Sequence, residues 1–172
     1  MPANVARLPS MATDPRQIVA LLTARAETVS TAESLTGGRL AAALTSVPGA
    51  SECVVGGVVA YATEVKVDLL GVPDEVVDEH GVVSGECAAA MATGVRDLLG
   101  TTYAMATTGV AGPDPQEGHP AGHVWVAVAG PRGVETRLLA LPGDRPEVQD
   151  ATCRHALSVL GGMLIKEEPA LG

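Results

Sequence analysis

The stretch TAESLTGG, residues 31–38, joins two sequence patterns that belong to different structural elements. The alternating ETVS (27–30) before it favours a strand, and the apolar RLAAALTSV (39–47) after it favours a helix. The octet itself holds one carboxylate, three hydroxyls and two glycines. Open α/β sheets are built from strands that turn directly into helices, and ligands bind where such strands end. The octet is therefore either the cap of a helix or part of a site.

The chain continues this alternation of strands and helices beyond the octet. Residues 53–61, CVVGGVVAY, are expected to form a buried strand, and residues 123–141 a hairpin around Pro131-Arg132-Gly133. We predict an α/β protein: a three-layer α/β/α sandwich with a mixed, mostly parallel sheet of about five strands. The other expected elements are helices at 14–26, 38–46, 64–71, 73–81, 84–99 and 145–166 and strands at 28–31 and 102–108.

Length and composition predict the kind of core and exclude one class of partner. The 172 residues suit a single domain, expected at 14–168 behind a flexible segment at 1–13. Hydrophobic residues make up 47% of the chain, but aromatic residues only 2% and Phe is absent, so the core should be aliphatic. A net charge of -9 repels a polyanion, so no nucleic acid partner is expected, whereas a small anionic ligand is compatible.

The cysteines and the apolar runs bear on the compartment. Cys53, Cys87 and Cys153 are odd in number and show no C-x-x-C spacing, so we interpret them as reduced core residues. The first dozen residues lack the apolar stretch of an export signal, and no later run approaches the ~20 residues of a membrane helix. A cytoplasmic protein with no membrane partner is expected.

Five motifs together resemble one known family. They are TAESLTGG, PGAS (48–51), Tyr61 with Lys66 five residues on, TTGVAGPD (107–114) and PGDR (142–145). In this order they are similar to the CinA carboxy-terminal domain family, over roughly residues 16–166. The resemblance implies one CinA C-terminal-like amidase domain that deamidates nicotinamide mononucleotide to nicotinate mononucleotide and ammonia. It implies no cofactor, a small nucleotide as substrate and a homo-oligomer, with a dimer favoured.

An amidase of this kind needs a nucleophile and a base. The family motifs place Ser34 and Ser51 in turns, and the sequence leaves open which of them attacks and whether either is only a cap. Lys66 is the only lysine in the first 165 residues and is the candidate base, against the alternative of a solvated surface lysine. Its pKa must fall by about 2 to 3 units to accept a proton near pH 7, which burial can supply. Tyr61 is expected to relay or orient that proton.

The octet also offers groups that bind a substrate. Gly37 and Gly38 would expose backbone N–H groups at a helix N-terminus, where they hold a phosphate or an oxyanion, with Thr36 beside them. The alternative is that Ser34 or Thr36 caps the helix and the glycines permit the turn. Glu33 has three possible roles: capping the helix, pairing with Lys66 or holding a ribose hydroxyl.

Two further substrate contacts are expected in the second half of the chain. Thr108, ahead of Gly109, matches the family's small hydroxyl at the end of a strand and is expected to contact the substrate or oxyanion rather than serve only as a turn residue. Arg145 opens the last helix, where an unpaired cation is unfavourable, so a bound phosphate would explain it. The alternative is a surface salt bridge to Asp144 or Glu147.

No metal site is expected. His119 and His123 are four residues apart, but Pro120 and Gly122 exclude the helix that would place them on one face, and the sequence has no H-E-x-x-H.

The sequence departs from the family pattern at a few positions, and a second function stays open beside the amidase. The alternative is a catalytically silent nucleotide-binding or regulatory domain that keeps the phosphate-holding turn without turnover. The departures are Leu35 for a common Cys, Thr63 for a usual Asn, Pro115 and Gln116 for glycines, and His119 for a frequent Lys.

Overall fold

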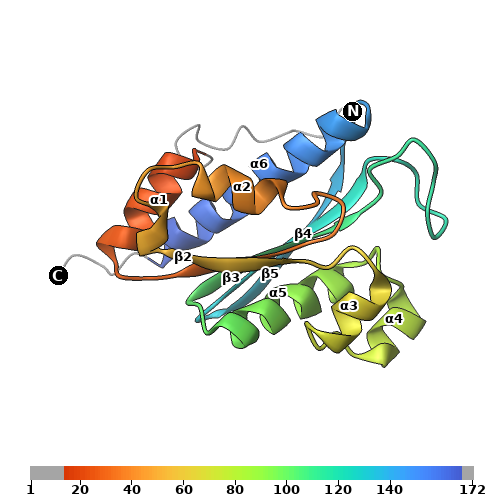
Figure 1. Cartoon of the computed structure of the whole chain (residues 1–172). Coiled ribbons are helices and arrows are strands. Elements are labelled where there is room, and N and C mark those ends of the chain that lie inside the picture. Colours follow the sequence, from red (N-terminus) through yellow and green to blue (C-terminus); the bar gives the residue numbers. More distant parts are fainter. Residues whose placement is uncertain (1–13, 168–172) are drawn as a thin grey trace.

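The computed structural model describes residues 14–167 and places five strands in one mixed sheet, in the order β2-β1-β3-β4-β5 (Figure 1). β1 pairs in parallel with both β2 and β3, whereas β4 pairs antiparallel with β3 and β5. Four strands thus run in one direction and β4 in the other, which confirms the expected mixed, mostly parallel sheet. The strands are β1 (Val29–Glu33), β2 (Val54–Val59), β3 (Tyr103–Gly109), β4 (His123–Gly130) and β5 (Gly133–Ala140).

Helices cover both faces of the sheet and complete the three layers that the sequence predicts. Figure 1 shows α1, α2 and α6 on one face and α3, α4 and α5 on the other. The segment 1–13, expected to be flexible, lies outside the described residues, as does residue 168. The helices are α1 (Pro15–Ala24), α2 (Arg39–Thr45), α3 (Thr63–Asp68), α4 (Asp74–His80), α5 (Gly85–Leu99) and α6 (Arg145–Lys166), with a short 3-10 helix η1 (Ala50–Glu52) before β2.

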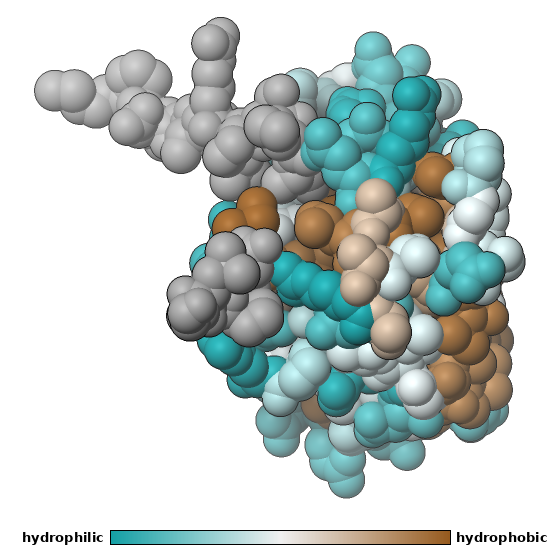
Figure 2. Space-filling model, turned by 90° about the vertical axis from the view of Figure 1, so that its left-hand side faces the viewer, coloured by the Kyte–Doolittle hydropathy of each residue, from teal (hydrophilic) through white to brown (hydrophobic). Residues whose placement is uncertain are grey.

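β2 is not the buried strand that its apolar sequence predicts. It forms one edge of the sheet, and the side chains of Val55 and Val59 are 51% and 50% exposed. In Figure 2, apolar side chains gather along the right-hand side of the molecule. This side faces the viewer in Figure 1, where β2 lies. The valine run reflects β propensity rather than burial, because an apolar run alone does not distinguish a central strand from an edge strand.

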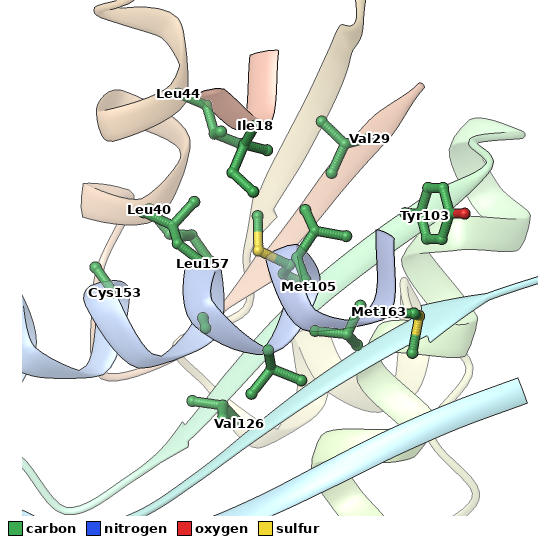
Figure 3. Close-up of a cluster of buried hydrophobic side chains, with 14 of the residues drawn as sticks. Ile18, Val29, Leu40, Leu44, Tyr103, Met105, Val126, Cys153, Leu157 and Met163 are labelled. Carbon is green, nitrogen blue, oxygen red and sulfur yellow. The ribbon is translucent and has the colours of Figure 1, made fainter. Parts of the chain in front are cut away.

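Two aliphatic clusters fill the spaces between the layers, as the composition predicts. The cluster under α1, α2 and α6 contains Leu, Val and Met side chains with one aromatic ring, that of Tyr103 (Figure 3). The cluster under α5 is built largely of Ala and Val. All three cysteines are buried and free, as expected, and burial raises the pKa of Cys87 to about 11, which keeps this thiol protonated.

None of the helices within residues 14–167 combines the length and the apolar character that crossing a membrane requires.

One close backbone contact fixes α3 against α5. Gly94, in the interior of α5, lies so near the end of α3 that a Cβ built on it would be 1.8 Å from the carbonyl oxygen of Leu70. No side chain fits between these backbones. Because α3 carries Lys66, the close packing at Gly94 also fixes the position of the lysine backbone.

This contact reverses the usual effect of glycine in a helix. Gly94→Ala should lower the free energy of unfolding by about 1–3 kcal/mol through overpacking. Gly162→Ala, in the interior of α6 with no atom within 4 Å of a new Cβ, should instead raise it by up to about 1 kcal/mol. Urea denaturation of both variants measures the two changes, and equal signs would contradict the close packing of α3 on α5.

Candidate active site

A cavity of about 470 Å³ lies where β1 and β3 end, within the size range of ligand sites. Its walls come from the turn after β1, from α3 and the residues before it, from the segment before α5, from the β3–β4 loop and from the start of α6. Six of the residues predicted from the sequence line it: Ser34, Tyr61, Lys66, Thr108, Gly109 and Arg145.

Lys66 is buried, contrary to the usual position of a lysine on a short helix. Its side chain is 2% exposed, and its Nζ donates to Ser34 Oγ at 3.1 Å, to Ala60 O at 2.7 Å and to Tyr61 O at 3.3 Å. Within residues 14–167, Lys66 forms no salt bridge. Burial of the ammonium lowers the pKa of Lys66, and the more distant carboxylates of Glu117 and Glu64 raise it less.

The three contacts of Nζ assign a direction to its lone pair. A carbonyl oxygen only accepts hydrogen bonds, so Ala60 and Tyr61 must each receive an N–H. A neutral amine has two N–H groups and one lone pair. When Lys66 is neutral, the lone pair therefore points to the Ser34 hydroxyl, which is the geometry of a base beside a nucleophile.

Tyr61 and Arg145 form the outer part of the site. Arg145 donates from Nη2 to the Tyr61 hydroxyl and from Nη1 to Gly112 O, both at 2.8 Å. The expected relay or orientation of a proton by Tyr61 finds no direct contact here, because the Tyr61 hydroxyl contacts Arg145 and only its backbone carbonyl contacts Nζ. The salt bridges considered for Arg145 are not formed either, since Asp144 and Glu147 make a capping box at the start of α6.

Thr108 and Gly109 lie where β3 passes into the loop. The Thr108 hydroxyl donates to Val82 O at 2.6 Å, so its proton is directed at the protein rather than at the centre of the cavity. Gly109 has no room for a side chain, because a Cβ would be 2.7 Å from both His123 O and the Cα of Val124. The structure thus gives both residues a role in shaping the wall of the cavity.

The structure does not bring Ser51 to the cavity. Ser51 is exposed in η1, before β2, whereas Lys66 follows β2. A six-residue strand separates the two ends by ~20 Å. The choice between the two serines, which the sequence leaves open, therefore favours Ser34, the one in contact with Lys66.

Three further residues of the octet, Thr36, Gly37 and Gly38, belong to the turn itself. Gly37 and Gly38 both have positive φ angles, and the Gly37 N–H donates to Ser34 O at 3.1 Å. The buried Thr36 hydroxyl pairs with that of Thr107 at 2.8 Å. None of the three lines the cavity, so their predicted contact with a phosphate or oxyanion finds no support here.

Glu33 takes the first of its three possible roles. Its side chain is 1% exposed, and its carboxylate accepts from the N–H of Leu40 at 2.7 Å and of Ala41 at 3.0 Å, in the first turn of α2. It also lies outside the cavity lining. Glu33 therefore caps α2 from within the sheet.

The described residues show no arrangement for a metal. Between residues 14 and 167 no three His, Cys, Asp or Glu side chains are grouped as ligands would be. The rings of His119 and His123 stack on each other with centroids 4.1 Å apart, a contact between imidazole faces rather than a pair of nitrogens aimed at an ion.

Comparison with known proteins places this chain in a family. A model of the CinA C-terminal domain matches residues 12–164. The chain belongs to the CinA C-terminal domain family. A CinA-like protein of Frankia casuarinae is 51% identical over 147 residues, which are 86% of this chain and 34% of that protein. The chain thus spans about a third of the length of the curated relatives it matches.

Solved structures share the fold of this CinA domain over nearly its whole length. A CinA superfamily protein from Klebsiella pneumoniae has a TM-score of 0.87 and 35% identity, covering 92% of this chain and 99% of that one. The competence/damage-inducible protein from Agrobacterium tumefaciens has a TM-score of 0.84 and 36% identity, covering 92% and 98%.

Sequence reasoning missed residues of the CinA domain that line the cavity or support its walls. Gln149 of α6 is buried and donates from Nε2 to Leu35 O at 2.8 Å, which fixes the peptide next to Ser34. Asp114 and Gln116 of the β3–β4 loop line the cavity. Asp114 stands in a family motif and was open to prediction, but no local pattern marks Gln149.

The cap formed by Glu33 generates a stability prediction. Glu33→Gln leaves one of two buried N–H groups facing an amide NH₂, so the free energy of unfolding should fall by about 1–3 kcal/mol in urea denaturation. Glu52→Gln, an exposed carboxylate outside the cavity, should change it by less than about 0.5 kcal/mol. Unchanged stability together with weaker substrate binding in Glu33→Gln would instead identify Glu33 as a ligand of the ribose.

Proposed function

We propose that this CinA domain is a metal-independent amidohydrolase that converts nicotinamide mononucleotide to nicotinate mononucleotide and ammonia. The observation that carries the proposal is the 3.1 Å contact between Nζ of the buried Lys66 and Oγ of Ser34 at the cavity. A serine hydroxyl is a weak nucleophile unless a base lies within hydrogen-bond reach. Lys66 is such a base, because burial favours its neutral form.

In the proposed reaction, Ser34 and Lys66 act in two half-reactions. Oγ of Ser34 attacks the carboxamide carbon while its proton passes to Nζ of Lys66. The tetrahedral adduct then expels the amine, which takes that proton and leaves as ammonia. A water molecule gives a proton to the same Nζ and attacks the acyl carbon, the ester bond to Ser34 breaks, and Oγ recovers the proton. The sum is one amide and one water converted to one acid and one ammonia.

In the same proposal, Arg145 supplies the charge that holds the phosphate. Its guanidinium lines the cavity and uses two of its five N–H donors on Tyr61 and Gly112, which leaves donors for a ligand. A guanidinium held in place by such contacts is suited to bind phosphate oxygens in pairs. The reacting amide would then lie deeper, beside Ser34.

Removal of the nucleophile tests the proposal most directly. Wild-type protein should release ammonia from nicotinamide mononucleotide, and Ser34→Ala should reduce kcat by about 10³-fold or more. Ser51→Ala is the matched control, an exposed serine in another turn, and should stay within about twofold. Binding of the nucleotide without any ammonia release by the wild type would favour the silent nucleotide-binding domain instead.

The proposed base generates a second prediction. Lys66→Met keeps the length and apolar stem of the side chain but removes the proton acceptor, so the single-turnover rate should fall by about 10²- to 10⁴-fold. Nucleotide affinity, measured by calorimetry, should change much less. A variant that binds weakly but reacts at the wild-type rate at saturation would make Lys66 a ligand of the phosphate rather than the base.

The lowered pKa of Lys66 also determines a pH dependence. The wild-type rate should rise with pH as Lys66 loses its proton. The rate should level off at a pH below 10.5, the ordinary pKa of a lysine. Unfolded chains bind this proton more tightly, so stability should be lost as pH falls from 10.5 through the folded-state pKa. Lys66→Met should abolish both dependences, and a stability profile identical to that of the wild type would show that Lys66 titrates normally.

A further inference from the structure

The β3–β4 loop projects beyond the end of the sheet in Figure 1, and the side chain of Glu117 anchors its tip to the segment before α5. The carboxylate of Glu117 accepts from the N–H of Val82 at 3.1 Å and of Val83 at 2.9 Å. It lies so close to Gly81 that a Cβ there would be 2.6 Å from Oε2. Residues 81–83 therefore receive the tip of a loop that is more than thirty residues away in sequence.

Glu117 holds this position in an unfavourable backbone conformation. Its φ is +51°, and among residues 14–167 only Ala26 and Glu117 have a positive φ without being glycine. A left-handed conformation costs free energy for a residue with a Cβ, and glycine would remove that cost. The two hydrogen bonds from Val82 and Val83 to the Glu117 carboxylate offset the free-energy cost of this conformation.

The contact of Glu117 joins two segments that line the cavity. Val82 and Val83 form one wall, and loop residues 112–116, which directly precede Glu117, form another. Val82 is held on both sides of its peptide, because its N–H donates to Glu117 and its carbonyl accepts from the Thr108 hydroxyl. Release of Glu117 would leave loop residues 112–116 without this side-chain anchor to Val82 and Val83.

We propose that Glu117 is a positioning residue that fixes the β3–β4 loop against residues 82–83 and thereby sets the affinity of the cavity for its nucleotide. This inference rests on the proposed function for the identity of the ligand, a nucleoside monophosphate. Glu117 does not touch the reacting atoms, so its loss acts on binding and leaves the Ser34 and Lys66 chemistry in place.

A local role for Glu117 predicts a different result. Residues 82–83 precede α5, whose N-terminus attracts a carboxylate. If Glu117 only stabilised the start of α5, its loss would lower stability without changing KM. A simple charge effect is a second alternative, because Glu117 and Glu64 both raise the pKa of Lys66. Glu64 is exposed on α3, and its side chain forms no salt bridge within residues 14–167, so Glu64→Gln is a matched control for charge.

The experiment compares Glu117→Ala and Glu64→Gln with the wild type in two measurements. Hydrogen exchange of the amides of Val82 and Val83 reports on the Glu117 contact without any substrate, and should accelerate by about 10-fold or more in Glu117→Ala only. Steady-state kinetics with nicotinamide mononucleotide should show KM raised by about 10-fold in Glu117→Ala, with kcat within about threefold. Glu64→Gln should match the wild type in KM.

Each outcome bears on one of the two proposals. Faster exchange with unchanged KM would overturn the inference and leave Glu117 as a stabiliser of α5. An equal rise of KM in both variants would also overturn it, in favour of long-range charge. A wild-type protein that releases no ammonia would refute the proposed function alone. In that case calorimetric binding of the nucleotide replaces KM, and equal affinity of Glu117→Ala and wild type would refute the Glu117 contact as a determinant of affinity.

Discussion

The buried amine of Lys66 is the constraint on which the site depends. A lysine without a carboxylate partner is costly to bury, and here two backbone carbonyls and one hydroxyl are its only hydrogen-bond partners among the described residues. These acceptors must be placed to within a few tenths of an ångström to satisfy it. The close approach of Gly94 to the end of α3 positions the helix that carries the lysine, and Gln149 fixes the peptide beside Ser34. Residues from α5 and α6 thus serve the same pair of atoms.

The turn that joins β1 to α2 divides two tasks between neighbouring side chains. Along a strand, successive side chains point to opposite faces. Glu33 is therefore directed at α2 and satisfies two N–H groups at its start, while Ser34, in the turn, reaches the cavity. The octet is therefore both a helix cap and part of a site: the carboxylate of Glu33 caps α2, and Ser34 lines the cavity.

Local signals were sufficient for the elements, while the site needed contacts that sequence does not encode locally. The apolar patterns of the sequence placed every α-helix and strand to within three residues of its observed ends, whereas the short 3-10 helix η1 was not predicted. The exposure of β2 was not predictable, because strand order is a property of the whole sheet. Ser34 and Ser51 looked equivalent in the sequence, and only the length of β2 between Ser51 and Lys66 separates them. Glu117 lies in no recognisable motif, and its contacts with residues 82–83 depend on how the β3–β4 loop folds back.

The departures from the family pattern fall unevenly on this structure. Leu35, which stands where the family commonly has Cys, packs in the cluster under α1, α2 and α6, and part of it reaches the cavity. This departure is therefore chiefly a change of packing. Thr63, Pro115 and Gln116 line the cavity, whereas Ser34 and Lys66 keep the residue types of the family motif. The departures thus fall on the walls of the cavity and leave Ser34 and Lys66 unchanged. A stiffer loop at 115–116 also loses less conformational entropy when it closes on a ligand than a glycine-rich loop does. Under the proposed function, these substitutions alter how the nucleotide is held rather than how its amide is cleaved.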